Sequence, residues 1–268
     1  MKTIVITGGT DGIGRALAQH AYDQGATVAI IGRDAAKGEA FAGLGERAHF
    51  IRADLSLREE NRRVLAELEA RFDAVDALVL CARYFNSHRR ETPDGFEHSF
   101  ALEYLSRYHL SHGLLGLLER ADAPLIVNVS GPGSRKPEIR WGDPGFTRGY
   151  SGVEAQFHAG RANDLLGLSF AATHPGIRTR YVLVHPGLVA TSFAGDYDPE
   201  TAGVVAQMKR QARSVEEGIA PIIPLLDAPP ADALSAFALG RRVDPRTTPG
   251  DDAAADRLHR LTETLLGA

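Results

Sequence analysis

Cysteine is almost absent from this sequence, because Cys81 is the only one among 268 residues. A disulfide within the chain is therefore excluded, and so are the paired-cysteine motifs of structural zinc sites and thiol redox centres. Long apolar runs are also missing, since none approaches the roughly 18 residues that a membrane-spanning helix needs. The first residues, MKTIVITGG, enter a β-branched run and a glycine turn without the apolar segment of a signal peptide. We expect a cytoplasmic protein with no membrane partner.

A basic excess is missing as well. The chain has 30 Lys and Arg against 34 Asp and Glu, a formal net charge of −4. Nucleic-acid-binding proteins usually carry a basic excess that displaces counterions from phosphates, so no nucleic-acid partner is expected. The share of hydrophobic residues, 44%, and of charged residues, 24%, is ordinary for a globular protein. The length suits one α/β domain over residues 1–268. We expect its substrate to be a small molecule.

Short β-branched runs alternate with longer segments of helical period, which is the pattern of βαβ units on a parallel sheet. Two less regular stretches, 131–150 and 188–230, follow strand ends, where open α/β sheets bind ligands. A last helix is predicted at 251–266, and its leucines along one side indicate that it packs on the core. The other predicted helices are 12–24, 34–43, 56–71, 94–119 and 154–173, and the predicted strands are 3–7, 27–31, 48–53, 76–82, 124–130, 177–185 and 233–239.

Three glycines follow the first predicted strand, in the stretch TIVITGGTDGIGRALA. Gly8, Gly12 and Gly14 form a TGxxxGxG array where a strand turns into a helix. Residues without side chains let the turn be tight and the backbone approach a pyrophosphate, whose charge the helix N-terminus stabilises. A plain glycine-rich turn is a poorer interpretation, because a strand precedes the array and a helix follows it. The stretch therefore predicts a dinucleotide site.

The end of the second predicted strand, IIGRD, bears on the choice of cofactor. An acid there would accept hydrogen bonds from the ribose of NAD, whereas Arg33 offers a guanidinium to the 2′-phosphate of NADP. We therefore expect NADP(H). NAD(H), or no cofactor at all, stays open, because Asp11 and Asp34 add negative charge beside the expected phosphate. Arg33 can also be interpreted as an exposed surface arginine.

Three motifs occur in order along the chain: TGGTDGIG, ADLSLREENRRVLAEL and VHPGLVATSF. With these motifs and their spacing, the sequence resembles the short-chain dehydrogenase/reductase superfamily over essentially its whole length. The stretch 131–156, GRAN and RSVEEGIAPIIPLL narrow the likeness to the retinol-dehydrogenase-like and WW-domain-oxidoreductase-like branch. The resemblance implies a single Rossmann-type, doubly wound α/β domain with a seven-stranded parallel sheet, and residues 188–230 as a substrate lid.

The resemblance also assigns residues to the cofactor. Asp54 and Leu55 would lie beside the adenine, and the stretch PGLVAT near the nicotinamide. The NAG triplet of the family reads CAR at residues 81–83, so the side chain of Arg83 must find room near the cofactor. The complete expected set is Gly8, Thr10, Gly12, Ile13, Gly14, Arg33, Asp54, Leu55, Ala82, Arg161, Pro186, Gly187 and Thr191.

The catalytic tetrad that the resemblance implies is altered at every position. The family uses a Tyr as acid or base, a Lys that lowers its pKa, a Ser that orients the carbonyl and an Asn that supports a proton-relay water. Here YxxSKxAN aligns with FHAGRAN, so Phe157 replaces the Tyr and Arg161 the Lys. Gly131 replaces the Ser and Glu103 the Asn. Ser130 is expected to point away from the substrate, because strand side chains alternate.

Other side chains are candidates for the missing chemistry. Phe157 has no proton to give, and Arg161 can grip the ribose hydroxyls although its pKa is too high for proton shuttling. Tyr150 would share a helix face with Phe157, about 10 Å away along the axis at the pocket mouth. Glu103 in an apolar pocket would have a raised pKa and act as acid or base. The alternative is that Glu103 is a silent partner of Arg161 or Arg83.

Two clusters of basic side chains can be interpreted either as solvated surface or as ligand-binding groups. His109 and His112 are spaced for metal binding, but a third ligand is lacking, so a solvated helix face is favoured and no metal site is expected. Arg83 and the stretch HRR at 88–90 follow the fourth predicted strand. They either attract an anionic substrate or form a solvated loop.

Three functions follow from these observations. The first is an atypical oxidoreductase in which NADP(H) passes hydride to a carbonyl or enone, with conjugate reduction favoured because carbanion character is spread before protonation. The second is a non-redox cyclase, isomerase or dehydratase that uses Glu103 for proton transfer. The third is an inert subunit that supports a partner through helices 94–119 and 154–173, which commonly form the family's four-helix dimer interface. We expect a homo-oligomer, dimer or tetramer, with a hetero-oligomer open.

Overall fold

The computed structural model describes residues 1–133 and 138–267. In these residues eight strands form one sheet in the order β10-β9-β7-β6-β4-β1-β2-β3. Neighbouring strands run parallel except for β10, which pairs antiparallel with β9. The sheet strands are β1 (Thr3–Thr7), β2 (Thr27–Gly32), β3 (Ala48–Arg52), β4 (Ala77–Leu80), β6 (Leu125–Val129), β7 (Arg180–His185), β9 (Leu234–Ala238) and β10 (Arg241–Val243).

The strand order reverses beside β1, which pairs with β2 on one side and with β4 on the other. Because parallel strands end at the same edge, the loops after β1 and β4 diverge there and leave a crevice. The central strands are apolar throughout: β4 reads ALVL and is buried at all four positions. The strand pattern thus places the loops that carry the glycine array and Arg83 on either side of one crevice.

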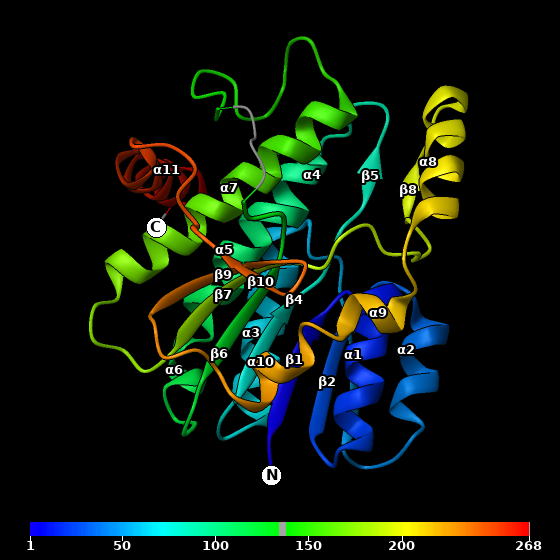
Figure 1. Ribbon diagram of the computed structural model, residues 1–268, viewed down its shortest axis with the longest axis vertical. Helices are drawn as coiled ribbons and strands as arrows, with labels where there is room; N and C mark the ends of the chain where they lie inside the picture. The colour runs from blue at the N-terminus through cyan, green and yellow to red at the C-terminus, as the bar shows by residue number, and fades with distance from the viewer. Residues whose placement is uncertain (134–137, 268) are drawn as a thin grey trace.

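Helices cover both faces of the sheet (Figure 1). Alternate residues of β1 show the two layers, since Ile4 and Ile6 belong to one core cluster and Val5 to the other. One face carries α1 (Gly12–Asp23), α2 (Ala35–Ala42), α9 (Val215–Ile219) and α10 (Ile223–Asp227). The other face carries α3 (Arg58–Arg71), α5 (Ser106–Gly113), α7 (Gly152–Thr173) and α11 (Asp251–Leu266).

The expected seven-stranded sheet has an additional strand, β10. The seven predicted strands are all present, and Leu239 and Gly240, both with positive φ, make the tight turn into β10. Sequence reasoning missed this strand because it is three residues long and begins with two arginines. Charged residues on a short edge strand discourage pairing with another chain but give no hydrophobic alternation to detect.

The predicted helix 94–119 is wrong as a continuous element. The chain forms a short turn, α4 (His98–Phe100), a π-helical segment, η1 (Ala101–Leu105), then α5 and α6 (Leu115–Leu118). The break between the last two falls at Gly113 and Leu114. In η1 the widened turn leaves the Glu103 carbonyl accepting a hydrogen bond from Asn163 Nδ2 at 2.7 Å. Single π turns of this kind often occur at functional sites.

The stretch 188–230 is more regular than the sequence indicated. It contains β8 (Gly195–Asp196), α8 (Pro199–Gln211), α9 and α10. β8 pairs in parallel with β5 (Phe85–Asn86), which follows Arg83. Figure 1 shows α8 and the β5–β8 pair at the end of the molecule opposite the N-terminus. The pairing ties this stretch to the loop after β4.

Helix α11 packs on α7, and its leucines join the core, as their pattern predicted. Leu258 and Leu266 are buried, and every residue of α7 from Arg161 to Phe170 is buried as well. The middle of α7 is therefore enclosed on all sides by its own chain.

We predict that the chain does not form the four-helix dimer that the family resemblance implies. That dimer would require α7 to offer a free face, but α11 and the sheet already bury residues 161–170. Cross-linking from the middle of α7 is expected to join no two chains at any concentration tested. A dimer that survives dilution, with cross-links on α7, would contradict this prediction.

Candidate functional site

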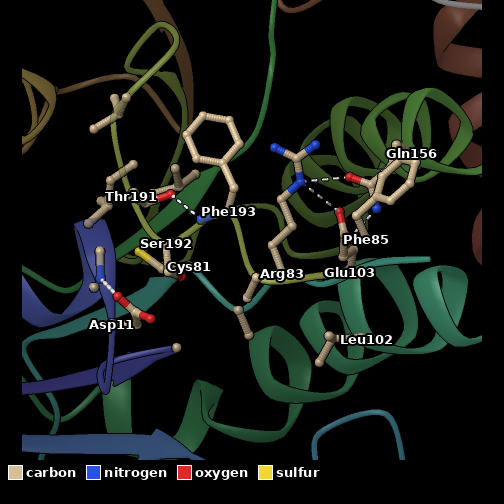
Figure 2. A pocket seen from close by; sticks show the side chains of 18 of the residues that line it. Asp11, Cys81, Arg83, Phe85, Leu102, Glu103, Gln156, Thr191, Ser192 and Phe193 are labelled. Carbon is tan, nitrogen blue, oxygen red and sulfur yellow. Dashed lines mark hydrogen bonds and ion pairs between the residues drawn. The ribbon is translucent and has the colours of Figure 1, made fainter. Parts of the chain in front are cut away.

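A cavity of about 850 Å³ opens at the crevice where the strand order reverses. It is lined by the glycine array, the ends of β2, β3, β4 and β6, the loop after β7, and α8. This volume lies within the range of ligand and cofactor sites. Figure 2 shows side chains of its lining, with Asp11 and Arg83 in different parts of it. Twelve of the thirteen expected cofactor residues line the cavity: Gly8, Thr10, Gly12, Ile13, Gly14, Arg33, Asp54, Leu55, Ala82, Pro186, Gly187 and Thr191.

The glycine array fits a dinucleotide because side chains are sterically excluded at all three of its glycines. A Cβ on Gly14 would lie 2.4 Å from the Gly8 carbonyl oxygen. Gly12 has φ +50, and a Cβ there would lie 2.6 Å from Thr191 Cγ2. The N-terminus of α1 thus meets the cavity with bare backbone, the arrangement that accepts a phosphate group.

Arg33 and Lys37 are two cations at one end of the cavity, which Asp11, Asp34 and Asp54 also line. Arg33 follows β2, its guanidinium carbon lies 4.7 Å from the ring centroid of Tyr84, and its Nη1 lies 3.9 Å from Asp54 Oδ2. Lys37, in the first turn of α2, places Nζ 3.2 Å from Asp11 Oδ2. Sequence reasoning missed Lys37, although its position four residues after Arg33 was a usable signal. Two exposed cations at this end suit a phosphate monoester.

Asp11 and Asp34, which counted against NADP in the sequence, cap helices. Asp11 Oδ1 accepts a hydrogen bond from the Gly12 N–H at 2.7 Å, and Asp34 Oδ1 from the Lys37 N–H at 3.1 Å. Their negative charges are thus partly balanced by the N-termini of α1 and α2.

Glu103, Gln156 and Arg83 meet at the other end of the cavity (Figure 2). Gln156 Nε2 donates a hydrogen bond to Glu103 Oε1 at 2.6 Å, and Arg83 Nε donates to Gln156 Oε1, also at 2.6 Å. Arg83 Nε lies 3.8 Å from Glu103 Oε2. Burial raises the pKa of Glu103, and Arg83 and Gln156 only partly offset this. Glu103 is therefore protonated to a higher pH than an ordinary glutamate.

Arg107 is a buried cation beside this group that sequence reasoning did not find. It reaches from α5 to the ends of two strands, where Nη1 donates to the Val129 carbonyl at 2.7 Å and Nη2 to the Ala82 carbonyl at 3.0 Å. Its exposure is 3%, and it lines the cavity. Gln156 was also missed, because nothing in the sequence distinguishes it from the other polar residues in the first turns of α7.

The replaced catalytic positions lie at this end as well. Phe157 and Gly131 line the cavity. Ser130 also lines it, and its hydroxyl donates a hydrogen bond to the Asn128 carbonyl at 3.4 Å. The direction expected for its side chain stays a prediction.

Arg161 does not line the cavity, and its predicted grip on the ribose is not what the structure shows. Its Nη1 and Nη2 bond to the two carboxylate oxygens of Asp251 at 3.1 and 2.5 Å. The side chains of this ion pair are 2% and 1% exposed. Both terminal nitrogens of the guanidinium are therefore engaged in the contact between α7 and α11.

Tyr150 is also placed differently from the prediction. Its hydroxyl donates to the Asn86 carbonyl at 3.0 Å, and it is not part of the cavity lining. Ser151 caps α7, which begins at Gly152, so Tyr150 precedes the helix and does not share a helical face with Phe157.

The two basic clusters lie in different surroundings. Of Arg83 and the stretch 88–90, Arg83 alone lines the cavity within the described residues. His112 is half-buried, not solvated, and its Nδ1 lies 2.9 Å from His174 Nε2. Among residues 1–133 and 138–267, no group of three or more His, Cys, Asp or Glu has the geometry of a metal site.

A family model described as short chain dehydrogenase matches residues 2–143. The chain is 26% identical to retinol dehydrogenase 14 of Mus musculus, over 99% of this chain and 86% of that protein. It is 30% identical to retinol dehydrogenase 12 of Bos taurus, over 70% of this chain and 61% of that protein. The structure of NADPH-bound carbonyl reductase from chicken fatty liver superposes with a TM-score of 0.68 at 15% identity, covering 91% of this chain and 98% of that chain.

None of the helices in the described part of the chain has the length and apolar character needed to cross a membrane.

Proposed function

We propose that this chain, which belongs to the short-chain dehydrogenase family, is an NADP(H)-dependent reductase of a small organic carbonyl or enone compound. Glu103 takes the place of the family's tyrosine as proton donor. The observation that carries this proposal is one continuous cavity, with a dinucleotide turn and two cations at one end and a buried, readily protonated carboxyl group at the other.

The residues at the Glu103 end of the cavity suit conjugate reduction. NADPH, when bound, supplies a hydride. Addition of hydride to the β-carbon of an enone moves an electron pair toward the carbonyl oxygen, and the α-carbon of the enolate then accepts a proton. Glu103 gives that proton and recovers one from water. The nearby guanidinium of Arg107 stabilises the negative charge that develops on the substrate.

The test is NADPH binding by calorimetry, followed by the loss of NADPH absorbance with a panel of ketones, aldehydes and enones. We expect NADPH to bind and at least one enone to oxidise it. A chain that binds neither NADPH nor NADH would contradict the proposal.

Cofactor preference provides a second prediction. Replacing Arg33 and Lys37 with glutamine is expected to weaken NADPH binding about tenfold or more, because two charge-assisted contacts to the 2′-phosphate are lost. NADH binding should change little, since that cofactor has a hydroxyl in the same place. Replacing Arg62 of α3, an exposed cation outside the cavity, with glutamine is the matched control. Equal losses for both cofactors would contradict the assignment.

The alternative function is proton transfer without redox change, such as isomerisation. It is favoured by the same raised pKa of Glu103, because acid–base chemistry at that carboxyl needs no hydride. Product formed while the NADPH absorbance stays constant would identify it.

A further inference from the structure

Arg83 presents a free edge of its guanidinium to the cavity. Nε is the engaged nitrogen, through Gln156 Oε1 at 2.6 Å. Within residues 1–133 and 138–267, the two terminal nitrogens have no hydrogen-bond partner, and the side chain is 65% exposed. Figure 2 shows both terminal nitrogens turned away from Glu103. Gln156 thus fixes the plane of the guanidinium and leaves the paired donors that bind a carboxylate in bidentate fashion.

The charge around Arg83 also favours an anion. Arg107 adds a second guanidinium, which has no carboxylate within ion-pair distance among the described residues and is bonded to carbonyl groups. Glu103 is the one carboxyl group in the Arg83 and Gln156 cluster, and burial raises its pKa toward the neutral form. Two cations therefore face at most one negative charge, so the potential at this end is positive.

The rest of the wall is apolar and aromatic. Phe85 and Tyr197 stack with ring centroids 5.3 Å apart beside the cavity. Phe193 lines it with φ +52, a left-handed conformation that costs about 1 kcal/mol or more for a residue with a side chain. Five of the eight exposed large hydrophobic residues in the described part of the chain line the same cavity: Val153, Phe157, Leu188, Val204 and Met208.

We infer that the substrate is an apolar, aryl-type compound with a carboxylate, and that the terminal nitrogens of Arg83 bind this carboxylate. The inference rests on the proposed function for the place where the substrate sits, and it adds the substrate class. A wholly neutral substrate would displace water from the Arg83 guanidinium without accepting its hydrogen bonds with a charged group, and this desolvation is unfavourable. An apolar acid satisfies the free guanidinium edge and the aromatic wall together.

The test uses benzoylacrylate, which has an aryl ring, an enone and a carboxylate, together with its methyl ester. Binding of both is measured by calorimetry with saturating NADP+, so that no hydride is transferred. The wild type is expected to bind the acid about tenfold or more tightly than the ester. Arg83→Met should abolish this preference by weakening acid binding, with little effect on the ester. Arg83→Lys should restore part of it.

Arg90→Met is the matched control, because Arg90 lies seven residues after Arg83, beyond β5, and outside the cavity lining. It should keep the preference for the acid. Mass spectrometry checks that the probe leaves Cys81 unmodified, as expected for a thiol whose pKa burial raises to about 12.

The outcomes separate this inference from the proposed function. If wild type binds the acid no more tightly than the ester, the inference is wrong, even if both compounds oxidise NADPH. If Arg83→Met weakens NADP+ and leaves the ratio of acid to ester unchanged, Arg83 belongs to the cofactor and the inference is again wrong. A preference for the acid that depends on Arg83, without NADPH oxidation by either compound, supports the anion site and contradicts the reductase.

Discussion

Replacing Asp251 with alanine is expected to lower the free energy of unfolding by about 3–5 kcal/mol, because it leaves the guanidinium of Arg161 buried without a counter-charge. The carboxylate also accepts hydrogen bonds from the Thr247 N–H at 2.7 Å and the Thr248 N–H at 3.2 Å. Loss of the carboxylate therefore removes the ion pair and also the hydrogen bonds that hold the segment before α11. Denaturant unfolding followed by circular dichroism measures the change.

The double variant Arg161→Met with Asp251→Leu is the control for this prediction. Removing both charges leaves no unpaired ion, so the double variant should regain most of the stability lost in Asp251→Ala. Asp252→Ala, at an exposed position next in sequence, should change stability little. If Asp251→Ala unfolds at the same denaturant concentration as wild type, the ion pair does not fix α11 on α7.

The pH dependence of stability has a definite sign. Burial alone would raise the pKa of Asp251, but hydrogen bonds from Arg161 and Thr248 outweigh it and hold the pKa well below the ordinary value. A carboxyl group with a lowered pKa in the folded state stabilises the protein above its unfolded pKa of about 3.9. That contribution is lost as the pH falls toward the folded pKa. Asp251→Ala should therefore lose less stability than wild type between about pH 5 and 2.

The sequence was sufficient for the parts of the site that local chemistry determines. The glycine array lies between a β-branched strand and a helix, so its role in the turn follows from neighbouring residues. Arg33 was identified from the strand that ends just before it. The strand predictions succeeded for the same reason, since apolar runs such as ALVL can only be buried.

Arg161 shows why the remainder of the site could not be predicted. Its position in FHAGRAN pointed to the cofactor, but its partner Asp251 lies 90 residues later in the sequence. Only the packing of α11 on α7 brings the two together. The orientation of Glu103 likewise depends on the π turn of η1 and on Asn163, and a pattern of helical period cannot reveal an extra residue in one turn.

Glu103→Gln is expected to lower kcat about 100-fold or more on the enone that wild type reduces, because the amide keeps the shape of the side chain but has no acidic proton. The amide oxygen can still accept the hydrogen bonds that the Tyr84 N–H and Gln156 Nε2 donate to Glu103 Oε1. The affinity for NADPH should therefore change by about twofold or less, which is as small as the effect of a neutral surface substitution. Steady-state kinetics with calorimetric binding of NADPH separates the two effects.

The pH–rate profile distinguishes a catalytic acid from a structural carboxyl group. Burial raises the pKa of Glu103, so wild type should be most active where Glu103 is protonated and should lose activity as the pH rises through that pKa. Glu103→Gln should lack this decline. Glu97→Gln is the matched control, since Glu97 is buried and has a raised pKa but lies outside the cavity lining. If Glu103→Gln retains the wild-type decline, a group other than Glu103 titrates in the rate-limiting step, and Glu103 is not the proton donor.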